Sequence, residues 1–465
     1  MEGYRFTDSR SRQVAYFNPF RGHMRNPGMG IICMAVSDHM VTGYSPEAWA
    51  RADREKPFEL TREMLREAAA LGFIDNFYIR VGWNDVQKEP GKLYLSKEFE
   101  MTLEAVEEAG LSWGFRIMQA SPSNPLEHLL PPFLVNRLPT HPYYNGRSYG
   151  PWPKKLPLYT DEYLKYWNEM LAMLGERFDP DTRLEYGDVS GYGLWGEGHH
   201  GCEVRPGVFE DLVLDSPERT NEVIETLIRG HRKAFPHTPA VLNLVMSEYE
   251  PVRKAIREGC WVRRDSYYKW FEAHHAEAGL QRSGDAAMIF ETVMPGMDLE
   301  DQDDPAFRHS SLELPRRMCE YGANYGIVGF NPLDTLYAAH VMPQLFDDFR
   351  NSIGYRLRPS IIWKTVRPNG KASIALGMVN DGCANPPGEM IFSAKCGEYE
   401  STASVNGSAF SGRMTLVEIP LPEAAKCMVE LSMSINIQGK VRPVCFAADD
   451  GSGKAPYVLN ICLDH

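Results

Sequence analysis

The chain has 465 residues, of which 43% are hydrophobic and 24% are charged, and its formal net charge is −13. This length and composition indicate a globular protein with a large core and room for more than one domain. An acidic surface does not attract polyanions, which excludes a nucleic acid as a general partner.

Targeting and redox signals are sparse. No stretch approaches the roughly 20 apolar residues of a membrane span, so we expect no membrane association. The N-terminus lacks a basic region followed by an apolar run, so a cytoplasmic protein is the simplest interpretation; a trimmed secreted or periplasmic chain would look the same. The nine cysteines are scattered and form no Cys-x-x-Cys pair, which predicts reduced thiols.

Strands and helices alternate in the first quarter of the chain, after an irregular polar segment at residues 1–27. This order predicts parallel strands joined by helical crossovers. The predicted strands are 28–36, 76–83 and 111–118, and the predicted helices are 61–71 and 96–109.

Residues 120–159 interrupt this alternation with nine prolines and several aromatic residues. A loop of this length in a compact domain is usually functional or disordered, and the aromatic residues argue against disorder. We expect an ordered wall beside the substrate site, with a purely structural wrap as the alternative.

The alternation then resumes. Five more strands are predicted, at 184–200, 239–246, 260–267, 286–293 and 325–330, with helices at 161–176, from 217, at 268–278 and at 336–353. Eight strands alternating with helices over about 330 residues predict an α/β fold, a (β/α)₈ (TIM) barrel with insertions.

After Tyr355 the pattern changes to short apolar alternations separated by turn residues, as at 372–379, 414–419 and 426–431. Such a pattern is typical of a small antiparallel β-sandwich. We therefore expect a catalytic barrel at 1–355 and a β-sandwich accessory domain at 356–465.

The glycine-rich stretch 184–200 carries the first candidate catalytic residue, Glu197. A carboxyl group held beside the indole of Trp195 in a partly dry cleft would favour its neutral form, which suits a general acid. An ordinary solvated glutamate is the alternative.

A second carboxylate, Glu291, ends the seventh predicted strand, while Glu197 ends the fourth. Active sites of such barrels lie at the carboxyl ends of the strands, and strands four and seven face each other across the mouth. Two carboxyl groups across a sugar-sized gap are what glycosidic cleavage needs. An ionised Glu291 would also favour the protonated form of Glu197.

The segment 80–91, RVGWNDVQKEPG, combines an Arg, a Trp and a Pro-Gly turn at the second strand. With the two carboxylates, over about 28–355, the chain resembles clan A glycoside hydrolases, most closely their β-galactosidase-like branches with a C-terminal β-sandwich. The resemblance implies a retaining β-glycosidase, with Glu197 as acid/base, Glu291 as nucleophile and a β-galactoside as first substrate. Gly196 stands where that family often has an Asn for the sugar 2-hydroxyl, so inversion stays an alternative.

Other strand-end residues are candidates for substrate binding. Aromatic rings suit sugar faces, an arginine on strand two would orient and ionise the nucleophile, and basic residues near Glu197 suggest a sulfated or acidic sugar. Core packing, turn roles and solvated charges are the alternatives. The candidates are Arg80, Trp83, Asn84, Asp85, Arg116, Tyr192, Trp195, His199, His200, Arg264, Asp265, Phe330 and Asn331.

No metal and no cofactor is expected. His199, His200 and Cys202 lack metal-ligand spacing, the acidic stretch 298–304 lacks the glycine of an EF-hand loop, and no glycine-rich phosphate loop is present. The expected partner is an oligo- or polysaccharide substrate, and a homo-oligomer is left open. A non-catalytic carbohydrate-binding barrel and a barrel enzyme of different chemistry are the alternative functions.

Overall fold

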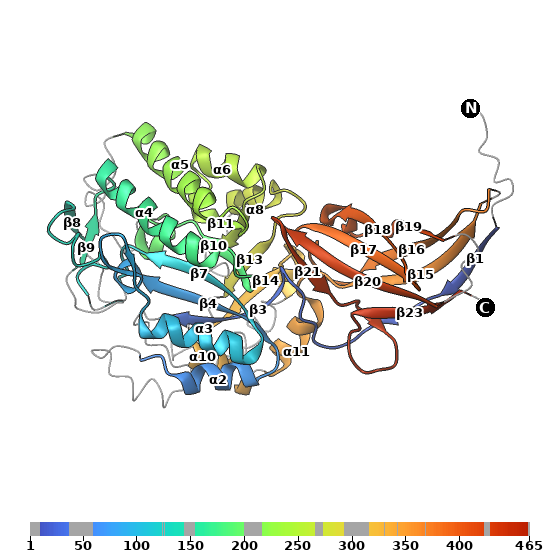
Figure 1. Cartoon of the computed structure of the whole chain (residues 1–465). Coiled ribbons are helices and arrows are strands. Elements are labelled where there is room, and N and C mark those ends of the chain that lie inside the picture. The colour runs from blue at the N-terminus through green and yellow to red at the C-terminus, as the bar shows by residue number, and fades with distance from the viewer. Residues whose placement is uncertain are drawn as a thin grey trace.

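A closed barrel of eight parallel strands forms the first part of the molecule, as the sequence predicted (Figure 1). In chain order the strands are β3 (Gly30–Val36), β4 (Ile74–Gly82), β7 (Ser112–Met118), β10 (Leu184–Asp188), β11 (Ala240–Asn243), β12 (Trp261–Arg264), β13 (Met288–Thr292) and β14 (Tyr325–Val328). The computed structural model describes residues 10–36, 59–122, 124, 126–143, 154–199, 216–265, 273–292, 316–329, 331–341, 343–367, 369–422 and 428–463.

Helices cover the outside of the barrel. They are α2 (Arg62–Ala70), α3 (Lys97–Ala109), α4 (Asp161–Phe178), α5 (Pro217–Ala234), α6 (Glu250–Arg257), α8 (Ala273–Leu280), α10 (Pro332–Val341) and α11 (Pro343–Ser352). Short 3₁₀ turns follow several strands: Trp83–Asp85, Leu194–Gly196 and Leu244–Met246.

Local sequence signals explain most helix limits. Thr61 caps α2 by accepting a hydrogen bond from the Met64 N–H at 3.3 Å, and Gly110 ends α3 in the left-handed conformation. The helix predicted at 336–353 is two helices, because the proline that opens α11 lacks the N–H needed to continue a helix. The prediction missed α6, which has only eight residues and three buried side chains.

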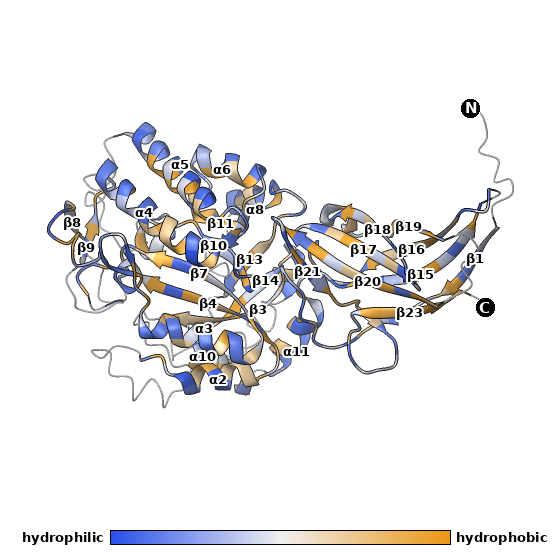
Figure 2. Cartoon of the chain, viewed as in Figure 1, coloured by the Kyte–Doolittle hydropathy of each residue, from blue (hydrophilic) through white to orange (hydrophobic). Residues whose placement is uncertain are grey.

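Two antiparallel sheets follow the barrel, with strand orders β1-β15-β16-β19 and β18-β17-β20-β21, and β23 pairs with β20. Their inner faces share one hydrophobic cluster, the arrangement of a β-sandwich. Figure 2 shows the alternation of hydrophobic and polar residues along β20. The strands are β15 (Leu357–Val366), β16 (Ala372–Asn380), β17 (Glu389–Cys396), β18 (Tyr399–Asn406), β19 (Thr415–Leu421), β20 (Met428–Ile437), β21 (Lys440–Val444) and β23 (Val458–Cys462).

The N-terminal segment departs from the expected division at 355/356. Strand β1 (Arg10–Ala15) pairs antiparallel with β15, and β2 (Asn18–Pro19) pairs with β22 (Ala448–Asp449). Residues 10–19 therefore belong to the C-terminal sheets rather than to the barrel. The sequence gives little sign of β1, because its residues are mostly polar and exposed at a sheet edge.

The C-terminal sheets are docked at the amino ends of the barrel strands. Arg442 of β21 makes a two-pronged ion pair with Glu185 of β10, its Nη2 lying 2.8 Å from Oε2. The Lys440 ammonium donates to the Leu184 carbonyl oxygen at 3.2 Å. The barrel interior and the sandwich share a continuous hydrophobic cluster, so the sheets seal this end of the barrel. Figure 1 shows them opposite the hairpin of β8 (Thr140–Tyr143) and β9 (Lys154–Pro157).

Two expectations from the sequence concern the oxidation state of the cysteines and association with a membrane. Cys396 is disulfide-bonded, so the expectation of reduced thiols is wrong for this residue, whereas six other described cysteines are free. In the part of the chain that the structure describes, no helix has the length and apolar character needed to cross a membrane.

Candidate active site

The barrel interior is built in two layers. Aromatic side chains such as Tyr78, Tyr186 and Trp261 fill the middle, continuous with the core below. Because successive strand residues point to opposite faces, the residue two positions further along each strand lies above this layer on the same side. These upper positions are charged or polar and buried: Arg80, Arg116, Asp188, Asn243, Arg263, Asp265 and Glu291.

Arg116 donates hydrogen bonds to three carboxyl groups. Its Nε donates to Asp188 at 3.0 Å, its Nη1 to Glu197 Oε1 at 2.8 Å and its Nη2 to Asp265 at 2.8 Å. Hydrogen bonds between ionised partners are short and strong, and a planar guanidinium fixes their directions. Arg116 was predicted to bind substrate; the structure shows a residue that holds three carboxyl groups in place.

Asp188 is a site residue that the sequence did not indicate, and Arg263, at the end of the sixth strand with Arg264 and Asp265, was not among the predicted substrate-binding residues. Arg263 Nε lies 2.8 Å from Asp188 Oδ2, and the Tyr78 hydroxyl donates to the same oxygen at 2.7 Å. The Arg263 guanidinium also lies over the Tyr78 ring at 4.2 Å. Side chains two residues apart on a strand point to the same face, so the inward-facing Trp261 indicates that Arg263 also points into the barrel.

Arg264, the predicted basic residue, has a different role. As the neighbour of Arg263 it lies on the other face of the strand, and its Nη1 donates to the Asp265 carbonyl oxygen. The three arginines of the charged layer are matched by Asp188, Glu197 and Asp265. These three arginines and three carboxylates carry no surplus positive charge, while the expectation of a sulfated or acidic sugar, which rests on Arg264 and the histidines beside Glu197, stays a prediction.

The turn that carries Glu197 follows β10 and is held by main-chain hydrogen bonds. Leu194 N–H donates to the His199 carbonyl oxygen at 2.7 Å, and Trp195 N–H to the Ala120 carbonyl oxygen at 3.0 Å. Gly198 has φ +85°, and a Cβ there would lie 1.9 Å from the Met246 side chain. Trp195 adopts φ +52°, a conformation that non-glycine residues rarely take. The turn therefore holds Glu197 in a fixed position.

Two guanidinium groups and an imidazole lie around the Glu197 carboxylate. Besides the Arg116 bond, Oε1 lies 3.8 Å from Arg80 Nη1, and Oε2 lies 3.0 Å from His199 Nε2. His199 is thus beside Glu197, as predicted, whereas Arg80, predicted to orient the nucleophile, is paired with Glu197. The Trp195 ring packs 5.8 Å from the His199 ring.

Glu291 stands in the opposite environment. It is 3% exposed, and among the described residues its Oε2 has no hydrogen-bond partner. Burial raises the pKa of Glu291 to about 8, and the negative charges of Asp265 and Glu197 add to this effect against Arg80 and Arg116. These surroundings favour the neutral form of Glu291 in the ligand-free protein. An ionised Glu291 was expected to act on Glu197, whereas the effect found here is that of the Glu197 charge on Glu291.

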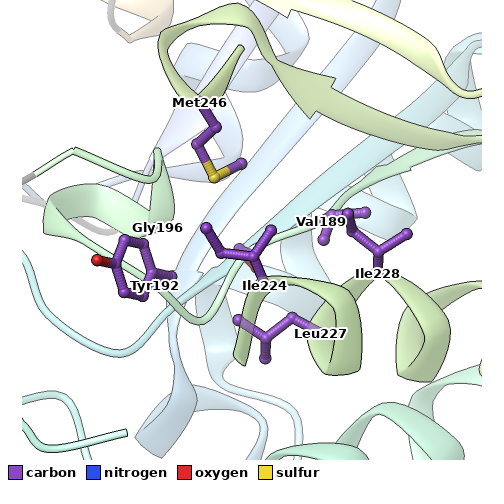
Figure 3. Close-up of a pocket in the computed structure, with 8 residues that line it drawn as sticks. Val189, Tyr192, Gly196, Ile224, Leu227, Ile228 and Met246 are labelled. Carbon is purple, nitrogen blue, oxygen red and sulfur yellow. The ribbon is translucent and has the colours of Figure 1, made fainter. Parts of the chain in front are cut away.

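A small apolar cavity lies behind the Glu197 turn (Figure 3). Its walls come from the segment after β10, from α5 and from Met246, and they contain no charged side chain. The cavity therefore separates the turn from the helix layer and does not serve as the substrate site.

The described part of the long loop contacts the Glu197 turn. Gly193 N–H donates to the Tyr159 hydroxyl at 2.8 Å, and the Tyr159 ring lies 4.6 Å from the Tyr192 ring. Tyr192 is buried between Tyr159 and Tyr249, so the structure gives it a packing role. The contact of the loop with substrate stays a prediction, and residues 144–153 lie outside the described residues.

Three predicted binding residues have structural roles. Trp83 is fully buried, edge-on to Trp167 at 5.0 Å, with its indole N–H donating to Gln87 at 3.0 Å, so stacking on a sugar is wrong for it. Asp85 accepts the Gly82 N–H at 2.8 Å, and Asn331 accepts the Asp334 N–H at 3.0 Å at the start of α10. Asn84 is half-buried, and its N–H bonds the Leu129 carbonyl oxygen. His200 and Phe330 lie outside the described residues.

Trp83→Ala is expected to lower the free energy of unfolding by about 3–5 kcal/mol, because it empties a large buried volume. The KM of the folded protein should stay unchanged, since the indole does not reach the site. Chemical denaturation and steady-state kinetics measure the two effects. Trp195→Ala, beside His199, is the contrasting variant; a raised KM in the Trp83 variant alone would contradict the packing role.

Within the described ranges, no group of three or more His, Cys, Asp or Glu side chains is arranged to hold a metal ion. Glu197 and Asp265 share Arg116 instead of converging on a common point.

No family model matches the chain, and no curated protein is similar to it in sequence. Among solved structures, the catalytic domain of β-amylase from Paenibacillus polymyxa aligns with 70% of this chain and 98% of its own, at 8% identity and TM-score 0.43. A GH5 family lichenase from Caldicellulosiruptor sp. F32 aligns with 73% and 99%, at 10% identity and TM-score 0.40. The tri-modular endo-β-1,4-glucanase B of Bacillus halodurans aligns with 94% and 98%, at 12% identity and TM-score 0.36. Such distant similarity assigns no activity, so the function is inferred from the residues of the site.

Proposed function

We propose that the protein is a glycoside hydrolase whose catalytic pair is Glu197 and Glu291. The observation that carries this proposal is a pair of buried carboxyl groups, Glu197 in the turn after the fourth barrel strand β10 and Glu291 on the seventh strand β13, close enough for the charge of Glu197 to act on Glu291. Arg80 and Arg116 act electrostatically on the same pair. Paired carboxyl groups with unequal surroundings are suited to acid and nucleophile roles.

In the retaining reaction, Glu197 gives its proton to the glycosidic oxygen as the bond to the leaving sugar breaks. The ionised Glu291 attacks the anomeric carbon and forms a glycosyl ester. Glu197, now a carboxylate, takes a proton from water, which attacks the same carbon and releases Glu291. Retention predicts about 5–5.5 Å between the carboxyl groups in a substrate complex, and inversion about 6.5–9.5 Å.

The pair needs one proton, and its location matters. Catalysis requires an ionised Glu291, whereas burial and the charges of Asp265 and Glu197 raise the pKa of Glu291 in the ligand-free protein. The reactive arrangement, with Glu291 ionised, is therefore disfavoured in the ligand-free protein. Asp265 opposes the reactive arrangement, because its charge disfavours ionisation of Glu291.

This coupling gives a pH prediction. The pair loses its only proton as the pH rises past the raised pKa of Glu291, about 8, so kcat/KM should fall above that pH. Of the two negative charges that raise the pKa of Glu291, that of Asp265 has the larger effect. Asp265→Asn removes this charge and should move the fall in kcat/KM to lower pH. It should also raise kcat/KM at the optimum, since Glu291 ionises more readily.

Asp188→Asn is the matched control, because Asp188 binds the same Arg116 guanidinium. Its alkaline limb should stay close to that of the unmodified protein. An alkaline limb that does not move in Asp265→Asn would show that Asp265 does not influence the pair. The measurement is kcat/KM from pH 5 to 10.

The activity itself is tested with a panel of nitrophenyl glycosides and natural oligo- and polysaccharides, with β-galactosides and sulfated chains included. Each is incubated with the unmodified protein and with the Glu197→Gln/Glu291→Gln double variant. Hydrolysis by the first and not the second supports the proposal. Binding without turnover would favour a carbohydrate-binding barrel, and loss of activity with a chelator would favour a metal-dependent enzyme.

A further inference from the structure

Two free cysteines meet where the barrel joins the C-terminal sheets. Cys319 lies in the helical segment before β14, and Cys383 lies in the loop after β16. The two side chains interact with each other, and Cys383 Sγ lies 3.2 Å from the carbonyl oxygen of Ala323, just after the helical segment that carries Cys319. Both are partly exposed, so small reagents have access to the pair.

Hydrogen bonds hold the loop of Cys383 against the neighbouring part of the barrel. Cys383 N–H donates to the Ser352 carbonyl oxygen at 3.1 Å, and its thiol lies 3.2 Å from the Ala323 carbonyl oxygen. Ala384 N–H donates to the Gly354 carbonyl oxygen at 2.9 Å. The Asn324 side chain donates to the Asn385 carbonyl oxygen at 2.9 Å. The loop after β16 is thus fastened to the barrel on either side of Cys383.

We propose that Cys319 and Cys383 form an exchange-active thiol pair, which low-molecular-weight disulfides such as oxidised glutathione convert to a disulfide between the barrel and the C-terminal sheets. The loop of Cys383 is fastened beside the segment that carries Cys319, so neither backbone has to move far to form such a bond. This proposal does not depend on the glycosidase function.

The two thiols have distinct roles in the exchange. The Cys383 side chain and burial raise the pKa of Cys319, so Cys319 is not the attacking thiol in the first step. Cys383 loses its proton to solvent, and its thiolate attacks one sulfur of oxidised glutathione, which forms a mixed disulfide and releases one glutathione thiolate. Cys319 then loses its proton, attacks Cys383 Sγ and releases the second glutathione. Two protein thiols are oxidised and one glutathione disulfide is reduced.

The bond would close a loop that contains β14, α10, α11, β15 and β16, and so would cross-link both units. A cross-link of this kind restricts the unfolded chain and stabilises the folded one. We expect a higher Tm in the oxidised form.

The test uses the full chain equilibrated in glutathione buffers of stepped oxidation, quenched with an alkylating reagent and mapped by mass spectrometry without reduction. We expect a peptide pair joined through Cys319 and Cys383, with a rise in Tm that dithiothreitol reverses. Cys319→Ser and Cys383→Ser should each abolish that pair and the rise in Tm. Cys260→Ser, which removes a buried thiol next to β12, should change neither.

Two outcomes would overturn the proposal. In the first, both cysteines stay fully alkylated at every buffer ratio. In the second, glutathione accumulates on one of them without the internal bond. Because the map is read on the unmodified chain, poor folding of a variant does not obscure the result.

Discussion

Glu291→Ala is expected to remove nearly all turnover, by a factor on the order of 10⁴ or more in kcat, while substrate affinity is largely kept. The attack on the anomeric carbon requires a carboxylate at this point, and no other described side chain takes its place on β13. Steady-state kinetics measure kcat, and calorimetry measures binding.

Glu291→Gln sharpens this test. Since burial already favours the neutral carboxyl group, an uncharged amide of the same size should keep the fold and the Tm. Loss of activity in this variant then reports chemistry, not unfolding. A Gln variant that hydrolyses its substrate at close to the unmodified rate would rule out the nucleophile role.

Glu197→Ala should give a different pattern. Substrates with good leaving groups need little protonation and should keep much of their rate, whereas sugar leaving groups should lose about 10²–10⁴-fold. Added azide should then take the place of water in the second step and yield a β-glycosyl azide. The measurement is kcat for an activated aryl glycoside and for a natural substrate, with analysis of the azide product.

The companion variant is Glu197→Gln, because the amide oxygen still accepts the Arg116 hydrogen bond and leaves no buried donor unpaired. Equal losses on activated and natural substrates in both variants would remove the acid/base assignment. An azide product of inverted configuration would support the inverting alternative.

The sequence predicts the barrel well, because its strands are apolar runs and its helices have clear caps. All eight predicted barrel strands are found, and each observed strand lies within or next to its predicted range. Elements held by tertiary contacts escape such an analysis. Strand β1 is a polar edge strand whose partner lies at the other end of the chain, and α6 is too short to show a clear period.

The site is only partly predictable for a related reason. The strand ends identify Glu197, Glu291 and Arg80, because the fold class places those ends together. Whether Trp83 faces the site or is buried depends on helix α4, because Trp167 of this helix packs against it. The location of the proton depends on burial and on charges from four different segments, and none of these is a local property of the sequence.

The pairing of β1 with β15 also constrains the order in which the molecule is made. Arg10 is synthesised before the barrel, and its partner Val366 follows only after the whole barrel has been synthesised. Contacts this distant in sequence form slowly. The β1 segment therefore stays without its partner strand throughout synthesis of the barrel, and the amino end of the barrel is sealed only after β21 has emerged. The sheet system is therefore completed only after the barrel, when strands that lie on either side of the barrel in the sequence pair with each other.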